Sequence, residues 1–147
     1  MSSFSYSLPV EADVAHLWAL MRDVQRVASL FPYTSVDDFR TLAPDRWVCW
    51  RRVTIPSIAD LRWREETWMD GEGTLRFTAV EGDLDTFDGR WQAAADAQGA
   101  RLTLAVDYVI PEALRPRMPA SMVEYVMGEL LKSICRRIKE AAEEAPA

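Results

Sequence analysis

The sequence contains few of the residues that metal centres and covalent catalysis require. His16 is the single histidine, and Cys49 and Cys135 are the two cysteines among 147 residues. Neither a Cys-x-x-Cys nor a His-x-x-x-His spacing occurs, although metal sites need such clusters of ligands. A glycine-rich phosphate loop and a Ser-His-Asp arrangement are also absent, which argues against a covalent nucleophile. We therefore expect no metal, no cofactor and a reduced pair of cysteines.

Positive charge and long apolar runs are scarce as well. The chain has 17 Lys and Arg residues against 23 Asp and Glu, and its formal net charge is -6. A phosphate backbone or an anionic membrane would repel such a chain, which argues against nucleic acid as the main partner. No segment approaches the roughly 18 uninterrupted apolar residues of a membrane helix, and the first residues lack the pattern of a signal peptide. We expect a cytoplasmic protein without membrane insertion, either a monomer or a homodimer.

Apolar residues make up 49% of the chain, which is enough for one substantial core. We expect a single domain over residues 1–147, with residues 143–147 as a frayed tail. The six tryptophans are unusual in a chain of this length. Their large apolar rings, each with one N–H donor, suit either a large core or a cavity that holds a flat, partly polar ligand.

The last segment, from Pro119 to Ala142, has the strongest periodicity. At about 100° per residue its apolar residues form one stripe, and its charged residues lie opposite. The stripe consists of Val123, Val126, Met127, Leu130, Leu131, Ile134 and Ile138. The pattern predicts an amphipathic helix of roughly 24 residues, about 35 Å long. The rest of the chain must supply an apolar surface of similar length to cover this stripe.

Most of the chain before that helix alternates with a period of two, which is typical of half-buried strands. The first strand is expected over Ser3–Leu8 and should end at Pro9, before two short helices near Val14–Met21 and Val24–Leu30. Six further strands are expected at Ser35–Leu42, Arg46–Ile55, Ala59–Met69, Thr74–Val80, Thr86–Ala94 and Arg101–Ile110. The short connections predict antiparallel neighbours. The expected fold is therefore of class α+β, a seven-stranded curved antiparallel sheet around the long helix.

Two groups of residues carry a resemblance to a known family. The first group is Val10, Ala12, Val14, Leu17, Trp18, Asp23, Phe31 and Pro32, and the second is Glu81-Gly82-Asp83-Leu84, Phe87, Gly89 and Trp91. With this order of elements, the chain resembles the polyketide cyclase/dehydrase and coenzyme Q-binding family, within the superfamily of lipid-transfer and birch-pollen-allergen-like domains. The resemblance extends over nearly the whole chain and implies a helix-grip fold.

Strand parity directs one set of side chains toward the long helix and so toward an internal cavity. Glu65 belongs to this set, because it alternates with Leu61, Trp63 and Thr67. A carboxyl group that loses its hydration in an apolar cavity can serve as a general acid or base near neutral pH. Glu65 is therefore the first candidate catalytic residue. The alternative is that a bulge places it on the outer surface, paired with an arginine of a neighbouring strand.

Hydroxyl groups and aromatic rings complete the candidate site. Tyr33 is the second candidate for catalysis, since a phenol can move protons. The candidate substrate-binding residues are Phe31, Thr34, Trp63, Thr67, Phe77, Phe87, Trp91, Tyr108, Met122 and Val126. For each polar member the alternative is a core hydroxyl with a satisfied partner, and for the aromatic members it is ordinary core packing.

The family resemblance also implies an activity. Similar aromatase/cyclases orient a poly-β-ketone with cavity arginines and a tyrosine, and their cavity phenylalanine and tryptophan match Phe31 and Trp63. Their arginine positions fall on Thr67 and Ala79, where this chain departs from the pattern. Two functions stay open: a cofactor-independent cyclase or dehydratase for a polyketide-like intermediate presented by an acyl carrier protein, or a non-catalytic carrier of a quinone, lipid or other hydrophobic metabolite. A third is a protein that binds a macromolecular complex.

Overall fold

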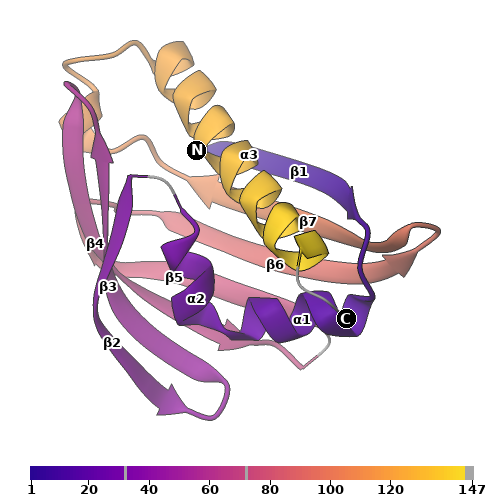
Figure 1. The fold of residues 1–147 in the computed structure, drawn as a ribbon. Helices are drawn as coiled ribbons and strands as arrows, with labels where there is room; N and C mark the ends of the chain where they lie inside the picture. The colour runs from indigo at the N-terminus through magenta and orange to yellow at the C-terminus, as the bar shows by residue number, and fades with distance from the viewer. Residues whose placement is uncertain (32, 72, 145–147) are drawn as a thin grey trace.

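One curved sheet and a layer of helices build the fold (Figure 1). The structure, a computed structural model, describes residues 1–31, 33–71 and 73–144. In chain order its elements are β1 Ser2–Val10, α1 Val14–Arg22, α2 Val24–Ser29, β2 Thr34–Ala43, β3 Arg46–Ile55, β4 Ala59–Met69, β5 Thr74–Gly82, β6 Phe87–Asp96, β7 Gly99–Tyr108, the 3-10 turn η1 Glu112–Leu114 and α3 Ala120–Glu144. The α+β class, the seven strands and the long C-terminal helix confirm the sequence prediction.

The sheet is antiparallel and has the order β1-β7-β6-β5-β4-β3-β2. Each strand from β2 to β7 lies beside its neighbour in sequence, because the connections are short, and β1 closes the sheet against β7. Figure 1 shows α3 crossing one face of the sheet diagonally, with α1 and α2 on the same side. No helix in the described part of the chain is both long enough and apolar enough to cross a membrane.

The described strands begin and end within one or two residues of their expected positions. The expectation that Pro9 ends the first strand is wrong, since β1 continues to Val10 and pairs with β7 along its whole length. Proline has no backbone N–H to donate, but β1 is an edge strand. The Pro9 carbonyl accepts a hydrogen bond from Lys139 Nζ at 2.9 Å, so this side of Pro9 faces α3. In an antiparallel strand the N–H and C=O groups of one residue point to the same side, so an N–H at this position would also point away from β7. The proline therefore removes no hydrogen bond between β1 and β7.

Helix α3 buries the stripe that its periodicity predicts. Its buried side chains are Val123, Leu131, Ile134, Cys135, Ile138 and Ala142. Met127 and Leu130 are partly buried and pack against the same core. Burial raises the pKa of the Cys135 thiol to about 12, so this residue packs as a small apolar side chain. The buried face of α3 thus closes the core along the length of the sheet.

Hydrogen bonds join the C-terminal end of α3 to the end of β1 and to the residue that follows it. Glu143 accepts hydrogen bonds from the Glu11 backbone N–H at 2.8 Å and from Lys139 Nζ at 2.5 Å. Lys139 in turn donates to the Pro9 carbonyl. Glu143 and Glu144, expected as part of a frayed tail, belong to α3, and residues 145–147 lie outside the described residues.

This contact predicts a pH dependence of stability. The pKa of the Glu143 carboxyl is lowered by the hydrogen bond from the Glu11 amide first, and by Lys139 second. Its contribution to stability is complete above the unfolded-state value near 4.5 and is lost as pH falls through the lower folded value. We expect Glu143→Gln to lower the melting temperature at about pH 7, by an amount that shrinks toward about pH 3. A difference that stays constant across this range would contradict the assignment.

Candidate functional site

An apolar cavity lies between α3, the short helices and the inner face of the sheet. Its volume is about 100 Å³, and residues of α1, α2, α3 and of every strand from β2 to β7 line it. Besides the tryptophans, its polar lining residues are Thr34, Arg51, Glu65 and Thr67. An apolar cavity of about 150 Å³ in another protein binds benzene, so this one has roughly the size of a single ring.

Eight of the predicted site residues line this cavity. They are Phe31, Thr34, Trp63, Glu65, Thr67, Phe77, Phe87 and Trp91. The pleat of the sheet brings six of them together, because alternate residues of β4, β5 and β6 face the same side. Phe31 follows α2, and Thr34 begins β2. Three of the aromatic rings form a continuous wall, with ring centroids 5.7 Å apart between Trp63 and Phe87 and 5.8 Å apart between Phe77 and Phe87.

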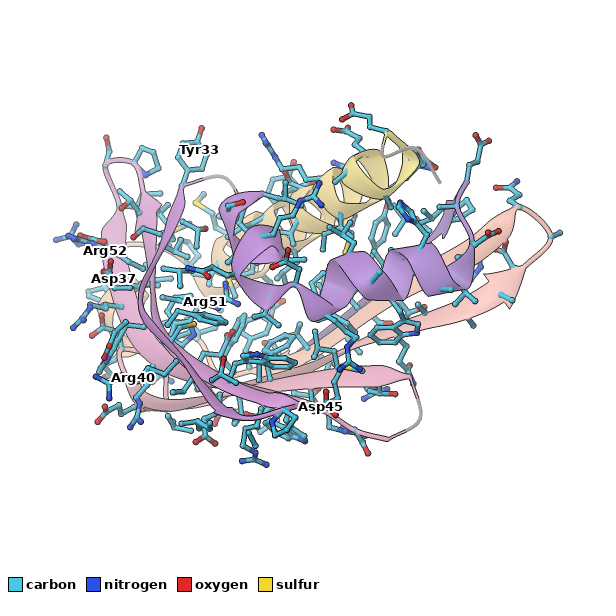
Figure 2. All side chains as sticks on the ribbon, turned by 60° about the horizontal axis from the view of Figure 1, so that its bottom comes forward. Tyr33, Asp37, Arg40, Asp45, Arg51 and Arg52 are labelled. Atoms are coloured by element: carbon cyan, nitrogen blue, oxygen red, sulfur yellow. The ribbon has the colours of Figure 1, made fainter. Side chains whose placement is uncertain are left out.

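The other four predicted residues do not line the cavity. Tyr33 is 67% exposed and has a positive φ of 58°, and its side chain stands at the outer edge in Figure 2. Met122 is 52% exposed, and Val126 is half-buried against the core. Tyr108 is buried, but it pairs with Ser2 at the end of β1. Burial, with a contribution from Glu124, raises the pKa of the Tyr108 phenol, so it stays protonated.

Glu65 faces inward and is paired with an arginine of the neighbouring strand. Arg51 Nε donates to Glu65 Oε2 at 2.5 Å, and the two residues are 8% and 4% exposed. The other carboxylate oxygen accepts from Trp63 Nε1 at 3.3 Å. In the β3–β4 register Cys49 lies opposite Glu65 and Arg51 opposite Trp63, so the ion pair is diagonal. The carboxylate therefore faces inward, and the alternative that places Glu65 on the outer surface is wrong. Its cross-strand arginine partner, which belonged to that alternative, is present but lies inside the molecule.

The ion pair sets the charge state of this end of the cavity. Burial lowers the pKa of the Arg51 guanidinium, but the Glu65 carboxylate, with a smaller contribution from Cys49, outweighs it, and the net pKa is raised. Burial also raises the pKa of the Cys49 thiol, although Arg51 opposes this effect. The thiol is therefore a poor nucleophile. Among the described residues no group of three His, Cys, Asp or Glu side chains could hold a metal ion.

The Nη1 group of Arg51 has no acceptor among the described residues. Its Nη1 atom is buried, and no described protein atom accepts a hydrogen bond from it. The guanidinium carbon lies 5.6 Å from the centroid of the Phe31 ring, which also lines the cavity. An unpaired buried donor costs about 1–3 kcal/mol. The site is therefore suited to a molecule that brings an acceptor oxygen to Arg51.

Arg51 is the functional candidate that the sequence analysis did not name. Its neighbours at alternate positions in β3 are Cys49, Val53 and Ile55, which face inward, and this parity is the signal that could have identified it. Figure 2 shows Arg51 inside the molecule, whereas Arg52 and Arg40 project outward from the edge of the sheet. The family's usual arginine positions fall on β4 and β5, so a cavity arginine on β3 was not expected.

Gly89 gives the cavity wall its shape. It lies opposite Phe77 in the β5–β6 register, and a Cβ atom placed on it would lie 2.2 Å from Phe77 Cζ. No real Cβ contact is that short, so a larger residue at this position must push the Phe77 ring away from the sheet. Since Phe77 lines the cavity, the free space is on that side.

We expect Gly89→Ala to fill the cavity. The displaced Phe77 ring should lower the free energy of unfolding by about 1–3 kcal/mol. It should also abolish binding of a single-ring aromatic ligand, which tryptophan fluorescence measures. Gly128→Ala is the control, because a Cβ at Gly128 meets Phe4 at an ordinary 3.8 Å and alanine favours the helix. Unchanged ligand affinity in Gly89→Ala would show that Phe77 does not border the binding space.

Solved structures share this fold over nearly the whole chain. The protein TTHA0849 of Thermus thermophilus aligns with a TM-score of 0.83 at 20% sequence identity, over 99% of this chain and 100% of that chain. The Zhui aromatase/cyclase from a Streptomyces species aligns with a TM-score of 0.80 at 19% identity, over 97% and 93%. A START superfamily protein from Mycobacterium smegmatis gives 0.75 at 15% identity, over 97% of both chains. No curated protein sequence matches the chain significantly.

A curved sheet, a long helix and an apolar cavity between them define a helix-grip protein. The chain belongs to the family described as polyketide cyclase / dehydrase and lipid transport, whose sequence model matches residues 10–141. This confirms the family resemblance seen in the sequence. The family and the fold relatives include both aromatase/cyclases and START-like proteins.

Proposed function

We propose that the protein is a cofactor-independent cyclase or dehydratase acting on a polyketide-like intermediate in this cavity. The observation that carries the proposal is the buried Arg51–Glu65 pair in an otherwise apolar wall. Ring closure of a poly-β-ketone passes through an enolate, and a fixed guanidinium stabilises the negative oxygen strongly where water is excluded. The cavity has room for the part of the poly-β-ketone that closes into the ring. An acyl carrier protein is the proposed source of this substrate.

Each polar residue of the wall has a separate role in this proposal. Arg51 Nη1 donates to the enolate oxygen as its charge develops. Glu65 accepts a hydrogen bond from Arg51 Nε, and each of its oxygens keeps a free lone pair. Glu65 takes the two protons of the attacking carbon in turn and delivers both to the oxygen of the attacked carbonyl, which leaves as water. The apolar walls hold the reacting carbons together and exclude water. Tyr33, which lies outside the cavity, takes no part in the reaction.

A carrier that binds a hydrophobic metabolite without reaction is the second candidate. It is favoured by the hydrogen bonds to Glu65, because both carboxylate oxygens are engaged by Arg51 and Trp63. A carboxylate held in this way positions the arginine, and each of its oxygens has one lone pair fewer to offer a substrate proton. In a carrier, Arg51 would fix the orientation of the bound molecule and nothing more.

A turnover assay with two adjacent arginines distinguishes these functions. Arg52 follows Arg51 in β3 but faces outward, where it pairs with Asp60 and keeps 54% of its side chain exposed. Each protein is incubated with a poly-β-ketone thioester analogue, and mass spectrometry follows the loss of water on ring closure. Per folded molecule, we expect Arg51→Met to lose activity about 100-fold and Arg52→Met to keep it. Recovery of the analogue unchanged from the wild type would favour the carrier.

A further inference from the structure

The wall of the cavity is electrically neutral. Arg51 and Glu65 are the two charged residues in the described lining, and their opposite charges meet across a single 2.5 Å hydrogen bond. The remaining lining side chains are aliphatic, aromatic, methionine or threonine, and none of them is charged. A ligand that carries a charge of its own therefore meets no net charge in the wall that would compensate it.

The Nη1 group of Arg51 lacks an acceptor in the part of the chain that the structure describes. Arg51 Nε donates to one oxygen of Glu65, and Trp63 Nε1 donates to the other. Arg51 Nη1 is buried, and no described protein atom accepts from it. A ligand oxygen that accepts a hydrogen bond from Nη1 removes the cost of a buried unpaired donor. This hydrogen bond therefore contributes more to the binding free energy than a hydrogen bond to a donor that was bonded to water before the ligand bound.

A carboxylate suits this donor poorly, despite the positive charge on Arg51. Its oxygens would approach the guanidinium close to the Glu65 carboxylate, which repels them. The carboxylate would also lose its hydration when it enters a cavity with apolar walls, and the cavity would then hold a net negative charge. A neutral carbonyl oxygen accepts the same hydrogen bond from Nη1 and incurs neither cost.

From these observations we infer that the cavity selects neutral single-ring carbonyl compounds and rejects carboxylates of the same shape. The cavity volume of about 100 Å³ sets the size of the ligand. The opposite charges of Arg51 and Glu65 cancel, so the cavity favours a ligand without net charge. The inference rests on the proposed function in so far as it concerns the same cavity, but it requires no reaction.

Three ligands of nearly the same shape test the inference on the wild-type protein. Acetophenone carries a neutral acceptor oxygen, benzoate carries a charged one, and α-methylstyrene has a methylene group in place of the oxygen. Isothermal titration calorimetry at about pH 7 measures the three dissociation constants. We expect acetophenone to bind at least about tenfold more tightly than either of the other two.

Glu65→Gln should reverse the preference between acetophenone and benzoate. The glutamine oxygen can still accept from Arg51 Nε, but the guanidinium then has no counterion, and a carboxylate ligand supplies one. We expect benzoate to bind this variant more tightly than acetophenone does and to raise its melting temperature more. Should the variant fail to fold, the ranking of the three ligands on the wild type decides the matter.

Three outcomes would overturn the inference. Equal wild-type affinities for acetophenone and α-methylstyrene would show that Arg51 Nη1 takes no part in recognition. Tighter wild-type binding of benzoate than of acetophenone would show that the neutral pair does not exclude anions. If none of the three ligands bound, single-ring compounds would not be the ligands of this cavity. A protein that ranks the ligands as expected but closes no ring overturns the proposed cyclase and leaves this inference in place.

Discussion

Replacing Arg51 with methionine is expected to lower the free energy of unfolding by about 3–5 kcal/mol. The substitution keeps much of the side-chain volume but leaves the Glu65 carboxylate, which is 4% exposed, without its charged partner. A buried carboxylate that loses its hydrogen-bonded cation keeps its desolvation cost, and Glu65 then has only the hydrogen bond from Trp63 Nε1 to offset it. Urea denaturation near neutral pH measures the loss as a shift of the unfolding midpoint at constant slope.

Two further variants separate the ion pair from general disturbance of β3. In the double variant Arg51→Met, Glu65→Met neither charge has to be desolvated, so most of the lost stability should return. Trp63 loses an acceptor in this variant, which limits the recovery. Arg52→Met, on the solvated outer face, should shift the midpoint far less than Arg51→Met. An Arg51→Met midpoint within error of the wild type would contradict the burial of the pair.

The fold could be predicted in detail because burial imposes a different period on each kind of element. Period-two alternation gave the strands to within one or two residues, and the stripe along residues 119–142 gave the long helix. Pro9 was misassigned for a reason that lies outside local sequence. Whether a strand tolerates proline depends on its being an edge strand, and that is a property of the whole sheet.

The candidate site could be predicted in part. Parity along a single strand predicted that Trp63 and Thr67 face inward from β4, where they line the cavity. It left two directions open for Glu65, which faces inward as well. The partner of Glu65 depends on how β3 and β4 are aligned, and the sequence of one strand does not contain that alignment. The register that sets Cys49 opposite Glu65 brings Arg51 within reach of the carboxylate. The sequence thus indicated Glu65 as an unusual residue of the inner face, but it indicated neither Arg51 nor the ion pair that the two form.

The residues placed outside the cavity differ from their prediction for local reasons. Tyr33 was named for its phenol, but it adopts a left-handed conformation immediately before β2 and its side chain is exposed. Met122 lies next to the buried Val123 in sequence but on a different face of the first turn of α3. Both positions lie at the end of an element, where periodicity gives the least information about direction.

Two isoleucines of α3 provide the second large effect on stability. Ile134 is 8% exposed and lines the cavity, whereas Ile138 is fully buried and lies outside the lining. Truncation of either to alanine should lower the free energy of unfolding by about 2–5 kcal/mol, because apolar burial is lost and a void remains. Alanine is the best helix former, so α3 itself is not weakened and the loss reports packing against the sheet. Denaturant midpoints of the two variants measure it.

Ligand binding distinguishes the two truncations, although both destabilise the protein. Ile134→Ala joins its new void to the existing cavity and should admit a two-ring ketone such as 2-acetylnaphthalene, whose binding then raises the melting temperature of this variant. Ile138→Ala leaves a separate void, so the same ligand should stabilise it no more than it stabilises the wild type. Equal responses of the two variants would mean that Ile134 does not border the binding space. An unchanged midpoint in Ile134→Ala would mean that α3 closes the core with a different face.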